Sequence, residues 1–215
     1  MIATSTPTTL SELATSGGQA FERLGLPNRK HEAWRYTSTR AFAQFGGHGL
    51  SPPDETLLGT VAKRLSELSP GPEDGARFVF VGGTLVSSLS SGQLPQGVSV
   101  SPLSEADLTD LGSIATSEED AFVALNTSHL TDGLAIDVER GSASKTPIEI
   151  IHVAIAGDAG GHPRVLLRAA PLSEVVVVER FVSLDDQPSM TNAVTEISAT
   201  GGAHVLHAQL IAPGA

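Results

Sequence analysis

The side chains that could bind a metal ion are histidines and carboxylates, because the 215-residue chain has seven histidines and no cysteine. His204 and His207 lie in a stretch with the pattern of a β-strand, and their odd spacing points them to opposite faces. The same odd spacing separates Glu149 from His152. Neither pair is placed to share a metal ion, so we expect no metal ligands. The lack of cysteine also excludes disulfides and thiolate ligands.

The candidates for acid–base catalysis are Asp185 and Asp186. Paired carboxylates hydrolyse glycosidic bonds in many enzymes, but adjacent acidic residues in a polar loop beside Pro188 are more typical of a turn. The glycine pairs match neither a phosphate-binding loop nor a dinucleotide-binding motif, and Ser173 has no G-x-S-x-G setting. The residues alone therefore predict no catalytic and no cofactor-binding residue. A β-solenoid enzyme acting on carbohydrate, with Asp185 and Asp186 as its acids, is the alternative hypothesis.

A basic and aromatic cluster occupies residues 27–40 and contains the only tryptophan and the only tyrosine, Trp34 and Tyr36. Four of the 13 basic residues of the chain lie in it: Arg29, Lys30, Arg35 and Arg40. One interpretation is a docking segment in which the aromatic residues anchor a partner and the arginines pair with carboxylates. The other is a turn whose aromatic residues pack onto the same domain. We favour the second and expect Trp34 to be largely buried.

The elements that must position these residues are mostly strands in the last third of the chain. Short segments rich in Val and Ile alternate there with clusters of Gly, Pro, Asp and Ser. Their apolar centres are Ile148, Val165, Val175, Val194 and Val205, so every second centre recurs after 27, 29 and 30 residues. This near-constant period is typical of the stacked coils of a β-solenoid. An antiparallel sandwich with irregular loops is the alternative.

Corners and outer loops of the expected coils follow from the same spacing. We expect short corners at 169–172 and 199–202, where one strand leads directly into the next. Longer loops are expected at 156–162 and 182–190.

The first part of the chain has a mixed pattern. Thr9 and Glu12 form the sequence of a capping box before a helix that begins at Leu10, and Gly25 is a stop signal. Adjacent glycines 17 and 18 weaken this helix. A second helix is expected over 51–68, with Asp54 in its first turn.

Further elements are expected before the strand-rich part. Residues 77–89 have the pattern of a hairpin around Gly82 and Gly83, and a short strand is expected at 98–100. Ser117 is expected to open a helix that ends before Thr131. A strand at 133–138 then begins the strand-rich part. We place a domain boundary here, with a mixed helical domain at 1–130 and the solenoid at 131–215.

Composition excludes several classes of protein. The formal net charge is −11, which repels nucleic acid and anionic membranes. Residues 175–178 form an apolar run far too short to span a bilayer, and the first ten residues lack the pattern of a secretory signal. We expect a cytoplasmic protein that binds neither nucleic acid nor membrane.

The order of several motifs resembles the SufD proteins of the SufB/SufD family, part of the SUF machinery for iron–sulfur cluster assembly. The motifs are K-x-E-x-W-R-Y-T at 30–37, AFVALNTSHLTDGLAIDVERG at 121–141, and the strand segments TPIEIIHVA, HPRVLLRA, SEVVVVERF and TNAVTEIS. The first motif is fairly specific, whereas the strand segments are shared with SufB. The resemblance implies a mixed N-terminal domain followed by a right-handed parallel β-helix.

The resemblance further implies a non-catalytic scaffold subunit with SufB and SufC as partners. The iron–sulfur cluster would be handled by the assembled complex, and this chain alone would bind no cofactor. The histidine late in SufD and the SufC-binding domain have no counterpart in these residues, so no functional residue of the family is carried over. A self-sufficient cluster carrier is disfavoured, because oxygen and nitrogen ligands alone rarely hold such clusters.

The strand expected at 204–211 would leave the last coil uncovered, as in a truncated solenoid. Unpaired backbone groups at such an edge favour association. We therefore expect a homodimer through this end of the β-helix, with two-fold symmetry.

Overall fold

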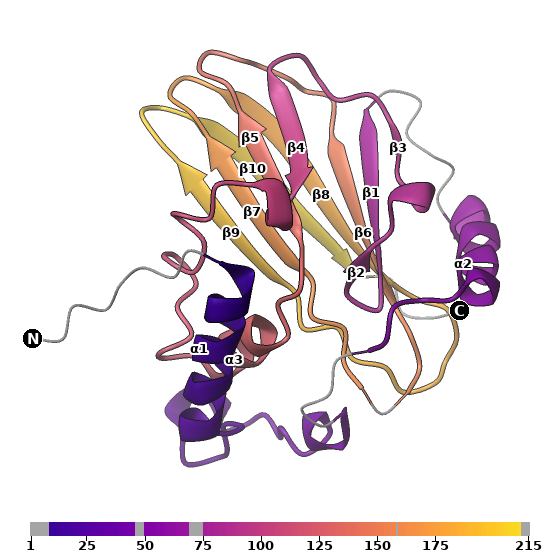
Figure 1. Ribbon diagram of the computed structural model, residues 1–215, viewed down its shortest axis with the longest axis vertical. Helices are drawn as coiled ribbons and strands as arrows, with labels where there is room; N and C mark the ends of the chain where they lie inside the picture. Colours follow the sequence, from indigo (N-terminus) through magenta and orange to yellow (C-terminus); the bar gives the residue numbers. More distant parts are fainter. Residues whose placement is uncertain (1–8, 46–49, 69–74, 158, 212–215) are drawn as a thin grey trace, which may run out of the picture.

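The computed structural model describes residues 9–45, 50–68, 75–157 and 159–211. These residues form a mixed α/β structure with two mainly parallel sheets and few helices (Figure 1). The α-helices are α1 (Leu10–Leu24), α2 (Glu55–Leu68) and α3 (Ala121–Ser128). Four short 3₁₀ helices are η1 (Glu32–Trp34), η2 (Phe42–Phe45), η3 (Ser87–Leu89) and η4 (Leu103–Glu105). No helix in the described ranges is long and apolar enough to cross a membrane.

One sheet has six strands in the order β10-β8-β6-β1-β2, with β3 also paired to β1. Its strands are β1 (Ala76–Val81), β2 (Thr84–Leu85), β3 (Ser91–Gly92), β6 (Ile148–Ala154), β8 (Glu174–Ser183) and β10 (His204–Ile211). The pairs β1/β6, β6/β8 and β8/β10 are parallel, whereas β2 and β3 are antiparallel to β1.

The other sheet has four strands in the order β4-β5-β7-β9. They are β4 (Val98–Pro102), β5 (Leu134–Val138), β7 (Arg164–Ala169) and β9 (Val194–Ala199). Strands β5, β7 and β9 pair in parallel, and β4 is antiparallel to β5.

From β5 to β10 the chain alternates between the two sheets, one strand at a time. Arg164 pairs with Val194, and Glu174 pairs with His204, so neighbouring strands of one sheet are about 30 residues apart. This interval agrees with the period predicted from the apolar centres. The parallel pairing shows that the antiparallel sandwich considered above is wrong for these strands. The short corners and longer loops lie close to the positions predicted.

The main core lies between the two sheets and consists of aliphatic side chains with one phenylalanine. It contains Phe80, Val98, Leu134, Ile136, Val138, Ile148, Ile150, Val165, Leu167, Val175 and Val177. Because alternate side chains of a strand point to opposite faces, residues 148, 150 and 152 of β6 all face this interior. The same alternation turns residues 175, 177 and 179 of β8 inward.

Helices cover the outer faces of both sheets (Figure 1). Val61 and Leu65 of α2 pack on Val79, Ile151 and Val153 of the six-stranded sheet. On the four-stranded sheet, Leu13 of α1 lies in a cluster with Leu103, Leu111, Leu130, Ala135 and Leu166.

Local signals placed several elements correctly. Thr9 and Glu12 form both hydrogen bonds of the capping box, and α1 ends before Gly25, which has a φ of 62°. Gly82 and Gly83 form the two-residue turn of the predicted hairpin, with φ of 59° and 90°. Strand β5 begins within one residue of its predicted start.

Two predicted helix starts were wrong. Helix α2 begins at Glu55 rather than 51, because the Asp54 carboxylate accepts the Leu57 N–H at 2.8 Å and so caps the helix. Helix α3 begins at Ala121 rather than Ser117, since Asp120 accepts the N–H groups of Phe122 and Val123. In both cases an acidic residue a few positions after the predicted start is the cap.

Candidate functional site

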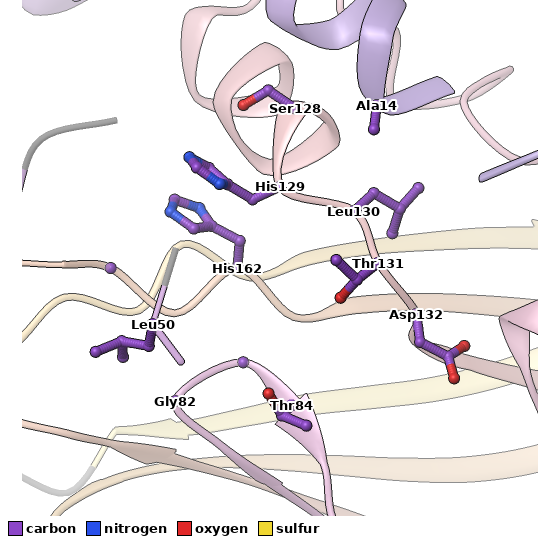
Figure 2. Close-up of a pocket in the computed structure, with 12 residues that line it drawn as sticks. Ala14, Leu50, Gly82, Thr84, Ser128, His129, Leu130, Thr131, Asp132 and His162 are labelled. Atoms are coloured by element: carbon purple, nitrogen blue, oxygen red, sulfur yellow. The ribbon is translucent and has the colours of Figure 1, made fainter. Parts of the chain in front are cut away.

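A cavity of about 240 Å³ lies where the end of α3, the β1–β2 turn and the loop before β7 meet (Figure 2). Leu50 and Ala14 contribute apolar side chains, and hydroxyl, imidazole and carboxylate groups contribute the polar ones. The lining residues are Ala14, Leu50, Gly82, Gly83, Thr84, Ser128, His129, Leu130, Thr131, Asp132, Gly160 and His162.

Two histidine rings stack at one side of this cavity. The centroids of His129 and His162 are 4.5 Å apart, with 18° between the planes (Figure 2). Burial, together with the neighbouring His129, lowers the pKa of His162 to about 3. His162 is therefore neutral near pH 7. Asn192 Nδ2 lies 3.3 Å from His162 Nδ1, and because an amide nitrogen only donates, Nδ1 accepts and Nε2 carries the hydrogen.

Two glycine pairs bring the backbone segments around the cavity into contact. A Cβ atom on Gly83 would lie 2.5 Å from the backbone nitrogen of His162, and one on Gly161 would lie 2.8 Å from the Gly82 carbonyl carbon. The glycines therefore hold the β1–β2 turn against the loop before β7, which explains the pairs 82/83 and 160/161 structurally. A further glycine pair of the sequence, at positions 46 and 47, lies outside the described residues.

A second polar cluster lies inside the core, between the two sheets. The Glu179 carboxylate, which is fully buried, lies 2.6 Å from Nε2 of His152 and 2.6 Å from Nε2 of His207. Thr195 Oγ1 donates to the same carboxylate at 2.7 Å. Burial raises the pKa of Glu179, but the hydrogen bonds from His152, Thr195 and His207 outweigh it and lower the pKa to about 2. The carboxylate is thus ionised, and both imidazoles donate from Nε2.

The His152 ring is also part of an aromatic stack across three strands. Phe80, His152 and Phe181 are register partners on β1, β6 and β8, with centroid distances of 5.3 Å and 4.7 Å. Nδ1 of His152 is buried and has no hydrogen-bond partner within the described residues.

Charged clusters on the outer faces of the sheets are paired as well. Glu149 binds Arg77 at 2.6 Å and Arg180 at 2.5 Å, so it does not face His152. On the four-stranded sheet, the buried Glu196 binds Arg164 at 2.6 Å. Burial lowers the pKa of the Arg164 guanidinium, and the Glu196 carboxylate acts in the opposite direction.

Glu196 also organises the segment that crosses the four-stranded sheet. Its carboxylate accepts the backbone N–H groups of Gly112, Ile114 and Ala115 at 2.9 to 3.0 Å. Arg164 meanwhile donates to Asn126 Oδ1 at 3.1 Å and so connects β7 to α3. In both buried clusters the carboxylate oxygens are occupied by donors from within the chain. Among the residues with described positions, no three His, Cys, Asp or Glu side chains are arranged to hold a metal ion.

The structure separates the other residues considered from the sequence. Asp185 and Asp186 are exposed, and Asp185 accepts the Gln187 N–H at 2.9 Å, as a turn-forming residue does. His204 is exposed, whereas His207 binds Glu179. Ser173 is buried and donates to the Ala170 carbonyl oxygen at 2.7 Å.

The aromatic pair of the basic cluster is divided between two environments. Trp34 is half-buried and lies 5.1 Å from Phe122 between ring centroids, so it packs on the same chain but less completely than predicted. Tyr36 is 93% exposed, and its expected packing onto the domain was wrong.

Sequence reasoning missed the cluster around Glu179 because it compared histidines within one strand. His152 and Glu179 are 27 positions apart, and Glu179 and His207 are 28 apart. The predicted period places residues at such intervals on neighbouring coils. Applying that period to the polar residues would have found all three.

Comparison with known proteins gives one informative match. The chain is 30% identical over 201 residues to the iron–sulfur cluster assembly protein SufD of Escherichia coli (strain K12). The chain is therefore related to the SufD/SufB family. The match covers 89% of this chain and 44% of SufD, so the chain spans less than half the length of this relative. No family model matches the chain.

Proposed function

We propose that this chain acts as a non-catalytic scaffold subunit in SUF-type iron–sulfur cluster assembly, in the cytoplasm, with SufB and SufC as its partners. The observation that carries the proposal is the 30% identity with SufD over 89% of the chain. The cluster would be handled by the assembled complex rather than by this chain alone.

The strand order supports a scaffold of the expected kind. Six successive strands, β5 to β10, alternate between two sheets and pair in parallel with strands about 30 residues away. We propose that they form the first coils of a right-handed parallel β-helix, with a mixed N-terminal domain up to about residue 130. Strands β1 and β4 of that first part extend the two sheets.

The chemistry of the buried clusters also favours a structural role. Glu179 and Glu196 each bind several donors from different elements, which stabilises the packing of the coils and leaves their oxygens occupied. The exposed Asp185 and Asp186 do not form a facing pair of acids, so the geometry does not favour the carbohydrate-active alternative.

The test is assembly with the partners. The tagged chain would be co-expressed with SufB and SufC from the same organism, purified without oxygen, and measured by light scattering and by iron and sulfide content. We expect the chain to co-elute with SufB and SufC in a defined complex. SufB and SufC expressed without the chain are the control. A chain that elutes alone under these conditions would contradict the proposal.

Light scattering of the chain by itself would also test the expected homodimer, which stays a prediction.

A further inference from the structure

The basic loop, defined as residues 27–40, is a closed and ordered segment. The hydroxyl of Thr39 donates to the carbonyl oxygen of Pro27 at 2.6 Å and ties the two ends together. Between them, a turn joins His31 to Asn28, and η1 is followed by a hydrogen bond from the Thr37 N–H to the Trp34 carbonyl oxygen at 3.1 Å. The backbone conformation is thus defined by contacts within the loop.

Aromatic packing fixes the basic loop on α3. The Trp34 ring centroid lies 5.1 Å from that of Phe122, and the Phe42 ring centroid lies 5.2 Å from that of Phe122. The loop therefore lies beside α1 and α3, at the lower edge of the molecule in Figure 1, rather than over the sheets. Tyr36, two residues after the anchor, remains 93% exposed.

The charges of the basic loop have no partners in the described structure. Arg29, Lys30, Arg35 and Arg40 are all exposed, and none of their side chains forms an ion pair or hydrogen bond with another described residue. The arginines on the sheets behave differently, since Arg77, Arg164, Arg168 and Arg180 each bind carboxylates. Glu32 is the only acidic residue within the loop. A chain with a net charge of −11 thus presents, on one loop, four cations that have no partner among the residues the structure describes.

We propose that the basic loop docks an acidic polypeptide segment of another protein, with Tyr36 as the anchor and the arginines pairing with carboxylates. Tyr and Arg are, with Trp, the residue types enriched at the hot spots of protein interfaces, and a pre-organised loop loses little conformational entropy on binding. Arginine binds carboxylates through two parallel hydrogen bonds. The proposal does not depend on the SUF assignment.

A protein partner fits this surface better than a nucleic acid or a membrane. A phosphate backbone or an anionic bilayer extends over the whole molecule and is repelled by its net charge. A short acidic segment engages only the loop. The exposed Tyr36 phenol also matches a protein pocket that contains an apolar side chain.

Trp34 provides an internal reporter, because it is the only tryptophan and lies in the loop itself. The chain would be titrated at physiological ionic strength with a synthetic peptide of glutamate and leucine, with oligothymidylate, and with phosphatidylserine-containing vesicles. The response would be the fluorescence of Trp34. We expect saturable binding of the peptide and weaker binding of the other two probes.

Two triple variants with the same charge change separate site binding from general attraction. Arg29→Gln/Lys30→Gln/Arg35→Gln should weaken peptide binding at least about tenfold, and Tyr36→Ala should weaken it severalfold. The control, Lys63→Gln/Arg140→Gln/Lys145→Gln, removes three exposed cations elsewhere and should change binding less than about twofold. Circular dichroism would verify that each variant is folded.

Three outcomes would overturn the proposal. The first is an absence of peptide binding up to millimolar concentration. The second is an equal loss in both triple variants. The third is tighter binding of oligothymidylate or vesicles than of the peptide, which would assign the loop to a different class of ligand.

Discussion

The Nε2 atom of His152 lies 2.6 Å from Oε2 of Glu179, although the two residues are 27 positions apart on neighbouring strands of one sheet. Neither side chain is more than 1% exposed. The other carboxylate oxygen accepts from Thr195 of the opposite sheet and from His207 of the next strand. One buried carboxylate therefore connects β6, β8, β9 and β10.

Replacing Glu179 with Gln should destabilise the protein. The glutamine amide has nearly the volume of the carboxylate, but only one of its two end atoms is an acceptor. The other is an NH2 group, which would face an N–H or O–H donor of His152, Thr195 or His207. Leaving buried polar groups unpaired costs a few kcal/mol, so we expect the free energy of unfolding to fall by about 2 to 4 kcal/mol. Urea denaturation would measure it. Glu174→Gln, an exposed change on the same strand, is the control and should stay within about 0.5 kcal/mol.

The same variant has a defined pH dependence. Because the folded-state pKa of Glu179 is lowered to about 2 from 4.5, its contribution is fully present above pH 4.5 and is lost as pH falls toward 2. The difference in free energy of unfolding between wild type and Glu179→Gln should therefore shrink as the pH falls from 4.5 to 2. A difference that stays constant from pH 4.5 down to pH 2 would show that the fold does not lower the pKa of Glu179.

His162 should make the stability of the protein depend on pH in a range above that of Glu179. Its folded-state pKa is lowered to about 3 from 6.5, so between these values the unfolded chain binds a proton that the folded chain does not. Stability should fall with decreasing pH by up to about 1.4 kcal/mol per pH unit from this group. Measurements between pH 6.5 and 4.5 separate it from Glu179. His162→Gln should reduce the slope, whereas His204→Gln, an exposed control, should retain it.

Replacing each of two adjacent glycines of α1 with alanine should change the stability of the protein in opposite directions. A Cβ on Gly17 would lie 2.7 Å from the Ser128 nitrogen and from Thr127 Cβ of α3, whereas one on Gly18 would lie 3.9 Å from Ser128 Cβ. Gly17→Ala should therefore lower stability by about 1 to 3 kcal/mol. Gly18→Ala should raise it by about 0.5 to 1 kcal/mol, because alanine favours the helix. Thermal unfolding of both variants would check this, and a stabilising Gly17→Ala would show that α1 and α3 are not in close contact.

Truncating Glu196 to alanine should lower the free energy of unfolding more than truncating its partner Arg164. Glu196→Ala removes the acceptor of the Arg164 guanidinium and of three backbone N–H groups, so we expect a loss of about 3 to 5 kcal/mol. Arg164→Ala leaves Glu196 with its backbone donors and should cost less. The free energy of unfolding in urea would be compared for both variants. Equal losses would indicate that the backbone contacts of Glu196 contribute little.

Properties set by neighbouring residues were determined by the sequence itself. The Thr9 capping box and Gly25 placed both ends of α1, because capping depends on side chains within a few residues of the helix end. The alternation and spacing of Val and Ile placed the strands and their period of about 30 residues, since this pattern follows from which face is buried. The resemblance to SufD was also present in the linear order of motifs.

Tertiary structure alone decided which side chains meet. The sequence shows acidic residues at 118–120, but Asp120 caps α3 while Glu118 pairs with Arg23, because α1 lies beside α3. Tyr36 is exposed and Trp34 is not, since only Trp34 faces Phe122. Glu179 has a low pKa because strands that are separated along the chain bring three donors to it. Burial and hydrogen bonding at these residues depend on contacts across the sheets, and the sequence of one strand does not specify its neighbours.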